Sequence, residues 1–316
     1  DNPYMKEAFD LCVEAGELPE SILVPVYSVA QDLFDREKLA LQVDAQIGID
    51  YLDGWVEQGH PGKSQTRIRA IGTRQVHVIA GNVPITAALT VIRTALSKSD
   101  SLIKLPSNDP LTTSAIVRTM IDMDPNHPVT RHMAVAYWKG GDEQLERQIF
   151  NPTRIERITA WGGMSSMTHI QKYLVPGIEL IPMNPKFSIS ILGHEALEDD
   201  TSMADAAMGI AIQAGQMNQV ACASTRVVYV ECDGSEEQLN KLDQLGEKIY
   251  RAWAHLPTSM STPAKRSNPA LEAEMDALAL DDTFYTVHGD TTGGGVIVSK
   301  LPEVVDFASQ LANRVV

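Results

Sequence analysis

The stretch VHVIAGNVP, residues 76–84, joins a short β-branched apolar run to a turn that contains Gly, Asn and Pro. This is the pattern of a buried strand that passes directly into a turn and a helix. The same change from strand to helix then recurs, with short connections, as far as Pro182. Strands are predicted at 76–80, 101–105, 133–138, 155–161 and 178–182, and helices at 85–97, 110–123, 142–150 and 164–173. Such alternation predicts an α/β fold, with a mostly parallel sheet covered by helices on both faces.

A second α/β region is predicted after Pro185, where we place a domain boundary. Its strands are expected at 187–192, 226–231 and 295–299, and its helices at 204–216 and 236–254. Ahead of the first sheet, apolar residues at three- and four-residue spacing predict helices at 3–15 and 29–56, followed by a loop at 59–64. Residues 258–269 also form a loop by composition, and they are the best candidate for a mobile surface segment. The sequence thus predicts an N-terminal helical segment and two α/β domains, 1–185 and 186–316.

Composition excludes several classes of function. Of the 316 residues, 44% are hydrophobic and 21% are charged, and the formal net charge is −15. The negative charge argues against a nucleic-acid binder, which needs clustered Lys and Arg. No apolar run reaches the roughly 18–20 residues of a membrane span, and no secretory signal is visible. Three cysteines without the spacing of a zinc site indicate a reduced, cytoplasmic protein without a metal.

Cys222 is the candidate nucleophile. It lies between a predicted helix and a predicted strand, in the stretch GQMNQVACASTR of residues 215–226, and its immediate neighbours are small. A thiolate is a strong nucleophile, and transfer of a thioester onto it replaces one thiol by another. The alternative from local sequence alone is a small buried hydrophobe, which a free cysteine often is. Cys12 and Cys232 have no comparable surroundings and are expected to be structural.

Other candidates follow the predicted strands of the first domain, where ligands of parallel sheets gather. Asn82 can donate its amide to a developing oxyanion, or it can serve only the turn in which it lies. Lys104 either contacts a cofactor ribose or phosphate or extends to solvent. Gly162 and Gly163 open a helix and allow a cofactor to approach the backbone closely. The fingerprint G-x-G-x-x-G is absent from residues 76–200, so a nicotinamide cofactor would have to be held in another way.

In their order along the chain, these motifs resemble one family. The set is AGNVP at 80–84, SLIK at 101–104, WGG at 161–163, NPKFS at 184–188, QVAC at 219–222 and GGGVIVS at 293–299. From about residue 70 to residue 316 the chain is similar to the acyl-CoA reductases of the bacterial luminescence system (LuxC-type), a branch of the aldehyde dehydrogenase superfamily. The resemblance implies an aldehyde-dehydrogenase-like fold, with a nicotinamide-cofactor-binding domain in 1–185 and a catalytic domain in 186–316.

The resemblance also implies a role for each candidate. Cys222 matches the acylated nucleophile, and Asn82 matches the oxyanion asparagine, whose partner is the backbone N–H of the cysteine. The residues that match the cofactor contacts are Lys104, Pro106, Ser107, Gly162 and Gly163. Family members continue well beyond the position of Val316, so part of the catalytic domain is expected to be missing. The full-length protein is expected to be a homo-oligomer.

Three departures from the oxidising members of the superfamily bear on the reaction. The stretch PMNPK at 182–186 lacks the Glu that activates water for hydrolysis of the acyl-enzyme, and Glu179 lies three positions upstream. Slow hydrolysis would leave an acyl-enzyme to accept hydride. The interval from Gln219 to Cys222 is one residue longer than usual. The segment LPS at 105–107 lacks the acid that often holds an NAD ribose, which favours NADPH, with NADH as the alternative.

The sequence therefore predicts reduction of a fatty acyl thioester, from acyl-CoA or an acyl carrier, to the aldehyde with NADPH or NADH. An acyl-transferring protein is a candidate partner. Two alternatives stay open: an NAD(P)-dependent aldehyde or semialdehyde dehydrogenase that oxidises its substrate, and a non-catalytic relic subunit. The sequence does not reveal the acyl chain length or the acyl donor.

Overall fold

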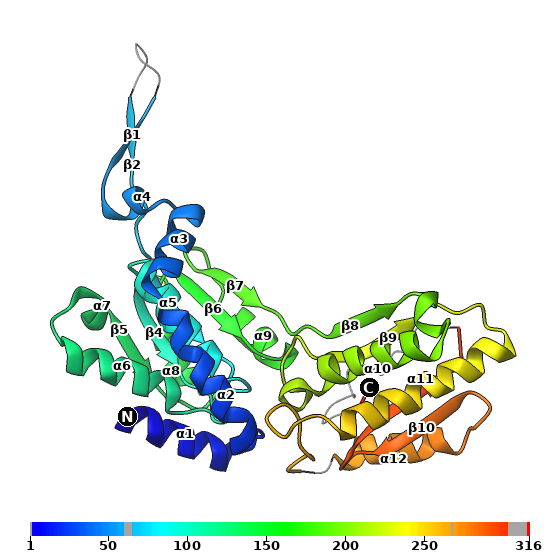
Figure 1. Ribbon diagram of the computed structural model, residues 1–316. Coiled ribbons are helices and arrows are strands. Elements are labelled where there is room, and N and C mark those ends of the chain that lie inside the picture. The colour runs from blue at the N-terminus through cyan, green and yellow to red at the C-terminus, as the bar shows by residue number, and fades with distance from the viewer. Residues whose placement is uncertain (1, 60–64, 267, 303–314) are drawn as a thin grey trace. The chain divides into compact units, whose positions relative to one another are not determined.

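The structure is a computed structural model of the chain and describes residues 2–59, 65–266, 268–302 and 315–316 (Figure 1). The chain forms two compact units. Unit 1 comprises Asp1–Gly16 and Val26–Pro185, and unit 2 comprises Glu17–Pro25 and Lys186–Val316. Within the described ranges, no helix combines the length and the apolar character that crossing a bilayer requires.

Unit 1 is built on a five-stranded parallel sheet with the order β5-β4-β3-β6-β7. The strands are β3 (Arg74–Val78), β4 (Asp100–Lys104), β5 (Met133–Ala136), β6 (Arg157–Trp161) and β7 (Glu179–Met183). The helices between them are α5 (Ile85–Leu96), α6 (Thr112–Met123), α7 (Pro128–Arg131), α8 (Glu143–Ile149) and α9 (Met164–Gln171). The predicted parallel sheet is confirmed, with ends that differ from the expected ones by a few residues.

Two apolar clusters cover the two faces of this sheet. Ile103 of β4 packs with Val91 of α5 and Val117 of α6. On the other face, Val76 of β3 packs with Met167 of α9 and with residues next to α8. The strand order reverses between β3 and β6, because the chain first builds outward from β3 to β5 and then returns to the other side. Such a reversal leaves a crevice at the carboxyl ends of the two central strands, where ligands of this sheet type bind.

The N-terminal segment is helical as predicted, but the segment 29–56 is divided into several short helices and ends in a strand. The structure has α1 (Pro3–Ala15), α2 (Glu20–Ala30), the 3₁₀ helix η1 (Gln31–Phe34), α3 (Arg36–Gln46) and α4 (Ile49–Asp53). Asp35 caps α3 through the backbone N–H of Lys38, and Gly48 has a positive φ of 89° ahead of α4. A cap and a left-handed glycine interrupt a helix even where apolar spacing continues.

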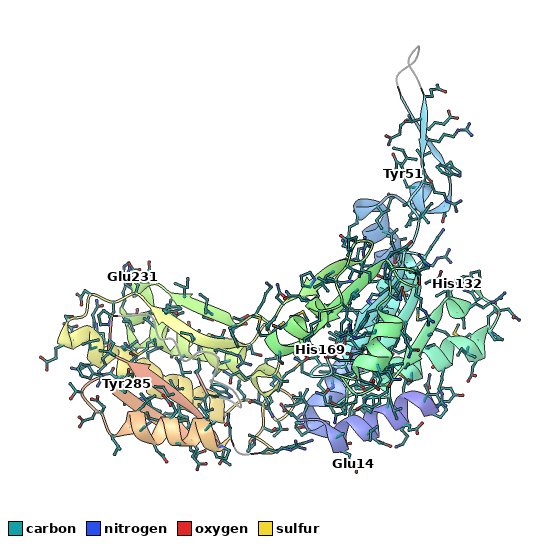
Figure 2. All side chains as sticks on the ribbon, turned by 180° about the vertical axis from the view of Figure 1, so that it is seen from behind. Glu14, Tyr51, His132, His169, Glu231 and Tyr285 are labelled. Carbon is teal, nitrogen blue, oxygen red and sulfur yellow. The ribbon has the colours of Figure 1, made fainter. Side chains whose placement is uncertain are left out.

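A β-hairpin that the sequence did not predict follows these helices. β1 (Val56–Gln58) pairs antiparallel with β2 (Thr66–Ile68), and Figure 1 shows the hairpin extending from the helical segment of unit 1. Gln58 donates a hydrogen bond of 2.7 Å to the hydroxyl of Tyr51, which lies near the base of the hairpin (Figure 2). Of the loop predicted at 59–64, residues 60–64 lie outside the described part of the chain.

Unit 2 contains two pairs of strands. β8 (Ser188–Leu192) runs parallel to β9 (Thr225–Val230), whereas β10 (Tyr285–Asp290) and β11 (Gly294–Ser299) are antiparallel. The helical elements are η2 (His194–Leu197), α10 (Asp200–Gly215), η3 (Gln216–Gln219), α11 (Glu236–Ala254) and α12 (Pro269–Ala279). The core lies between α10 and α11, where Trp253 is 2% exposed. The sequence did not predict β10 or α12.

The loop predicted at 258–269 is present up to Asn268, apart from residue 267, which is not described, and Pro269 begins α12. The prediction that this segment lies at the surface is wrong for Ser261. Ser261 is 4% exposed and accepts a hydrogen bond of 3.1 Å from the indole of Trp253. The backbone N–H of Thr262 donates to Asn218 at 2.8 Å. Long-range hydrogen bonds that local composition does not reveal hold this segment against the core.

A buried carboxylate joins α8 to α9 in unit 1. Glu146 is 3% exposed, and its Oε1 accepts hydrogen bonds from Trp138 Nε1 and from the backbone N–H of Gly141. Its Oε2 lies 2.6 Å from His169 Nε2 and 2.9 Å from the hydroxyl of Tyr173, which donates to it (Figure 2 labels His169). Burial alone would raise the pKa of Glu146, but these hydrogen bonds outweigh it and hold the pKa below its ordinary value.

Replacing Glu146 by Gln should lower the free energy of unfolding by about 2 kcal/mol at neutral pH, because the buried donors lose a charged acceptor. The pKa is depressed in the folded state, so the difference between wild type and variant should be full above the ordinary glutamate pKa. It should disappear as the pH falls through the depressed pKa. Urea unfolding at neutral pH and at about pH 3 measures both effects. Glu143→Gln, an exposed change on the same helix, should cost under about 0.5 kcal/mol. Equal losses of unfolding free energy for the two variants would contradict this role of Glu146.

Candidate functional site

The loops that leave the strands of unit 1 meet at one edge of the sheet. Val78 at the end of β3 is opposite Lys104 of β4 and Ala160 of β6. Three connections therefore start from neighbouring carboxyl ends of strands. They are the turn with Asn82, the loop with Pro106 and Ser107, and the turn with Gly162 and Gly163. The parallel sheet brings these sequence-predicted residues of unit 1 to the same edge, on both sides of the point where the strand order reverses.

Asn82 is exposed in the turn between β3 and α5. The hydroxyl of Thr86 closes this turn by donating to the carbonyls of Ala80 and Val83. Gly81 has no room for a side chain, since a Cβ there would come within 2.1 Å of Asn108 Oδ1 in the loop after β4. The glycine lets the two loops approach each other, and the turn that results directs the next residue, Asn82, to the surface.

Lys104 ends β4 and is half-buried. Its Nζ lies 5.4 Å from the ring centre of Trp138 and 6.0 Å from that of Tyr137, and 3.5 Å from the carbonyl of Leu105. Burial lowers the pKa of Lys104, while the charge of Glu146 opposes that shift. The aromatic rings restrain the lysine stem, so the ammonium is held at the edge of the sheet where a phosphate or ribose would arrive.

Gly162 and Gly163 connect β6 to α9. A Cβ on Gly162 would lie 3.0 Å from the Cβ of Ser166, whereas a Cβ on Gly163 would meet nothing within 4 Å. Gly163 has a φ of −71°, so its backbone conformation does not require glycine. The backbone conformation therefore does not explain why residue 163 is a glycine. The open space beside it is what a close approach of a ligand to the start of α9 would need.

Cys222 is exposed in the turn between η3 and β9 of unit 2. Its carbonyl accepts a hydrogen bond of 2.7 Å from the hydroxyl of Ser188 on β8. The neighbouring Ser224 is buried, and its hydroxyl donates to the carbonyl of Gln216 at 3.1 Å. The alternative of a small buried hydrophobe is therefore excluded for Cys222. It fits Cys12 instead, which is 4% exposed and has its pKa raised by burial to about 11.

The backbone ahead of Cys222 is left-handed at three successive residues that are not glycine. Met217, Asn218 and Gln219 have φ values of 53°, 51° and 63°. Each such residue costs about 1 kcal/mol or more and persists only where its surroundings hold it. The strained backbone therefore indicates that the surrounding structure holds the turn before Cys222 in one particular conformation.

Two buried amides hold this strained segment, and sequence reasoning did not identify their role. Asn218 is 6% exposed and exchanges two hydrogen bonds with Thr262, at 2.9 and 2.8 Å. Gln219 is 1% exposed; its Nε2 donates to the carbonyls of Thr225 and Val315, and its Oε1 accepts from the N–H of Val315. In the sequence, the available signal for this role was the polar pair Asn218-Gln219 next to small apolar residues. These amides are positioning residues for the Cys222 turn.

Glu179, the carboxylate upstream of the position of the missing base, lies at the wrong edge of the sheet for that role. It is the first residue of β7, and Arg157, the first residue of β6, donates to it at 2.6 and 2.9 Å. The candidate cofactor loops leave the opposite, carboxyl ends of the strands. Glu179 is therefore an ion-pair partner at the amino edge of the sheet.

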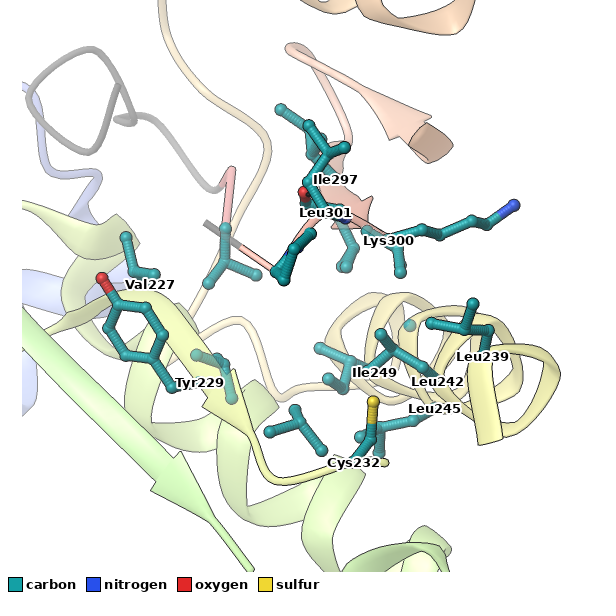
Figure 3. A pocket seen from close by; sticks show the side chains of 18 of the residues that line it. Val227, Tyr229, Cys232, Leu239, Leu242, Leu245, Ile249, Ile297, Lys300 and Leu301 are labelled. Carbon is teal, nitrogen blue, oxygen red and sulfur yellow. Dashed lines mark hydrogen bonds between the residues drawn. The ribbon is translucent and has the colours of Figure 1, made fainter. Parts of the chain in front are cut away.

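Among the described residues, no group of three His, Cys, Asp or Glu side chains is arranged to hold a metal ion. A cavity of about 610 Å³ in unit 2 is lined by β9, α11 and β11, and Cys222 is not among its lining residues (Figure 3).

Solved structures with a similar fold are aldehyde dehydrogenases. The NADP-dependent glyceraldehyde-3-phosphate dehydrogenase of Bacillus halodurans C-125 superposes on 92% of this chain with a TM-score of 0.65 and 16% identity, over 60% of its own length. An NAD-dependent benzaldehyde dehydrogenase from Corynebacterium glutamicum covers 93% of this chain and matches over 62% of its own length, with a TM-score of 0.61 and 17% identity. The predicted aldehyde-dehydrogenase-like α/β fold is confirmed.

Sequence comparison identifies the family of the chain. The long-chain acyl-protein thioester reductase of Aliivibrio fischeri is 34% identical over 218 residues, 68% of this chain and 43% of that protein. The corresponding protein of Vibrio harveyi is 29% identical over 230 residues, 72% of this chain and 46% of that protein. The chain thus spans less than half the length of these relatives. The profile described as acyl-CoA reductase (LuxC) matches residues 4–316. The chain therefore belongs to the acyl-CoA reductase (LuxC) family.

Proposed function

We propose that the protein reduces a long-chain acyl thioester to the aldehyde, with a nicotinamide cofactor and through an acyl group carried on Cys222. The observation that carries the proposal is the exposed Cys222 on a strained turn that buried amides hold in place. Membership of the LuxC family and the printed names of the relatives supply the substrate class. Because the chain spans under half of those relatives, activity, substrate and partners are all part of the proposal.

The reaction begins at the sulfur of Cys222. Its thiolate attacks the thioester carbonyl, the carbonyl electrons move to oxygen, and the donor thiol leaves as the carbonyl re-forms. Thiol replaces thiol, so this step is nearly balanced in energy. The backbone N–H of Cys222 and the amide of Asn82 donate to the oxyanion. Asn82 belongs to unit 1 and Cys222 to unit 2, so their joint action is an inference from the family resemblance.

The carboxyl edge of the unit 1 sheet fits a dinucleotide. Lys104 presents an ammonium between two aromatic rings, and the space beside Gly163 is open. When bound, the reduced nicotinamide supplies the hydride that converts the acyl group to a thiohemiacetal on Cys222, which releases the aldehyde. The residues that would hold the cofactor are Lys104, Pro106, Ser107, Gly162 and Gly163.

NADPH is the proposed cofactor, with NADH as the alternative. Residues 105–107 carry no acid, so this segment has no carboxylate that would repel a 2′-phosphate. Among the neighbours in fold, one is described as NADP-dependent and complexed with NADP, and another as NAD-dependent.

Reduction is favoured over oxidation because the structure places Glu179 away from the cofactor edge and engages it with Arg157. A relic subunit is disfavoured because the strain at 217–219 is retained next to an exposed thiol. The proposal also includes acyl-CoA or an acyl carrier as the acyl donor, and an acyl-transferring protein as a partner. The full-length protein is proposed to be a homo-oligomer with a cytoplasmic location.

Replacing Cys222 by Ala should abolish both covalent labelling by radioactive palmitoyl-CoA and thioester-dependent NADPH oxidation, to below about one thousandth of wild type. Cys232→Ala is the control and should keep both. Gel autoradiography and absorbance at 340 nm are the measurements. Stable label on the Cys222→Ala protein would overturn the nucleophile assignment.

Replacing Asn82 by Ala should lower kcat about 100- to 1000-fold, because one donor to the oxyanion is lost. Thermal stability should change little, since Asn82 is exposed. Asn126→Ala, an exposed change elsewhere in unit 1, should leave kcat unchanged. A rise in KM for the thioester with an unchanged kcat would assign Asn82 to ground-state binding instead.

Replacing Lys104 by Met should raise KM for NADPH about tenfold, as expected for loss of one charged hydrogen bond. It should raise KM for NADH less, if the lysine contacts the 2′-phosphate. Because burial lowers the pKa of Lys104, NADPH binding should weaken with rising pH earlier than an exposed lysine would cause. The control is Lys139→Met in the exposed loop after β5. Equal KM values for wild type and Lys104→Met would remove Lys104 from the site.

A further inference from the structure

A buried cluster in unit 1 is centred on the carboxylate of Glu146, which accepts hydrogen bonds from two separate segments. The first segment follows β5 and supplies Trp138 Nε1 and the backbone N–H of Gly141, each at 3.3 Å. The second contains α9 and supplies His169 Nε2, at 2.6 Å, and the hydroxyl of Tyr173, at 2.9 Å (Figure 2 labels His169). One carboxylate therefore joins the loop after β5 to α9 and the residue that follows it closely.

The loop after β5 also holds the candidate cofactor lysine. Lys104 Nζ lies 5.4 Å from the ring centre of Trp138 and 6.0 Å from that of Tyr137. The two rings differ in burial, because Tyr137 is 55% exposed whereas Trp138 is 6% exposed and donates to Glu146. Since Trp138 cannot shift without losing this hydrogen bond, Glu146 limits where the ammonium of Lys104 can lie.

The charge of Glu146 acts on the same lysine. Burial lowers the pKa of Lys104, and the negative charge of Glu146 opposes that shift. The carboxylate therefore restrains the ammonium through the indole of Trp138 and also helps it to remain charged.

The other end of the cluster reaches the second half of the candidate cofactor edge. Gly163 precedes the first residue of α9, and a Cβ on this glycine would meet nothing within 4 Å. His169 lies in the last turn of α9, and its ring packs edge-on against that of Tyr173 with ring centres 5.5 Å apart. Because both side chains contact Glu146, the position of α9 is tied to that of Trp138.

A carboxylate suits this place better than an apolar or a neutral polar side chain. Glu146 is 3% exposed, and a buried charge is costly unless hydrogen bonds satisfy it. A buried polar group that is fully satisfied makes its surroundings rigid. A glutamine could accept only at its one oxygen, so one pair of donors would face its NH₂ group instead.

We infer that Glu146 is a positioning residue for dinucleotide binding, which holds the ammonium of Lys104 in a fixed place relative to the start of α9. The inference rests on the proposed function for the identity of the ligand. Both oxygens of Glu146 accept from protein groups, so the carboxylate acts through Trp138 and Lys104 and does not contact the dinucleotide.

Isothermal titration calorimetry of the whole protein with NADPH alone tests the inference. Glu146→Gln and Lys104→Met should each raise the Kd about tenfold. The double variant should bind about 10- to 20-fold more weakly than wild type, and not 100-fold, because both changes remove the same restrained ammonium. A 100-fold loss in the double variant would mean that Glu146 acts independently of Lys104, and it would overturn the inference. An unchanged Kd for Glu146→Gln would overturn it too.

Two further variants separate positioning from a general loss of stability. Thr94→Val removes a buried hydrogen bond of 3.1 Å to His77 elsewhere in unit 1, and its Kd for NADPH should stay within about twofold of wild type. Trp138→Phe keeps an aromatic ring beside Lys104 but cannot donate to Glu146, so it should weaken binding about as much as Glu146→Gln. It replaces Glu146→Gln in the titrations if that variant does not fold. Equal weakening by Thr94→Val and Glu146→Gln would contradict the positioning role.

Labelling with radioactive palmitoyl-CoA in the absence of nucleotide distinguishes this inference from the proposed function. Glu146→Gln should label on Cys222 like wild type, and its KM for NADPH should rise about tenfold while kcat changes less than about twofold. A tenfold fall in kcat with an unchanged Kd for NADPH would overturn the positioning role. Absence of label on the wild-type protein would instead overturn the proposed acyl-enzyme, and the NADPH titrations would still decide the role of Glu146.

Discussion

The structure of unit 2 depends on one buried amide, that of Gln219. Removing an amide from water without partners costs several kcal/mol, so Gln219 is stable only where main-chain groups meet it. It joins the start of β9 to Val315, residues far apart in sequence. The same residue ends the left-handed segment before Cys222. The position of the turn that carries Cys222 is thereby coupled to the contact between the start of β9 and Val315.

In unit 1 the direction of the strands places the candidate site residues at one edge of the sheet and ion pairs at the opposite edge. Parallel strands send all their outgoing loops to one edge, so the turn at Asn82, the loop after Lys104 and the turn at Gly162 meet there without any local signal that relates them. The opposite edge carries the ion pairs Arg74–Glu156 and Arg157–Glu179. A carboxylate that looks close to a catalytic position in sequence can therefore lie at the far end of its strand.

The sequence was sufficient for elements that are apolar throughout or regularly periodic. The strands of unit 1 are short β-branched runs, and their alternation with helices admits little besides a parallel sheet. Prediction from the sequence failed where local signals compete with long-range contacts. The apolar spacing at 29–56 continues across the Asp35 cap and Gly48, and β10 alternates too weakly to stand out. Asn268 before Pro269 is a helix-start signal, whereas the overall composition of residues 258–269 predicts a loop. The role of Gln219 could not be predicted, because its partner Val315 is 96 residues away.

In the proposed reaction, the fate of an acyl group on Cys222 depends on which acceptor reaches it first. Hydrolysis needs a base that removes a proton from water near the carbonyl, and hydride transfer needs only the reduced nicotinamide and an oxyanion site. The residues that follow β7 carry no carboxylate, and Glu179 is ion-paired at the other end of that strand. Thiol exchange onto Cys222 is nearly balanced in energy, so the acyl-enzyme is readily regenerated from the thioester. In the proposed reaction, an acyl-enzyme that forms reversibly and hydrolyses slowly would accumulate until hydride arrives, which favours the aldehyde as the product.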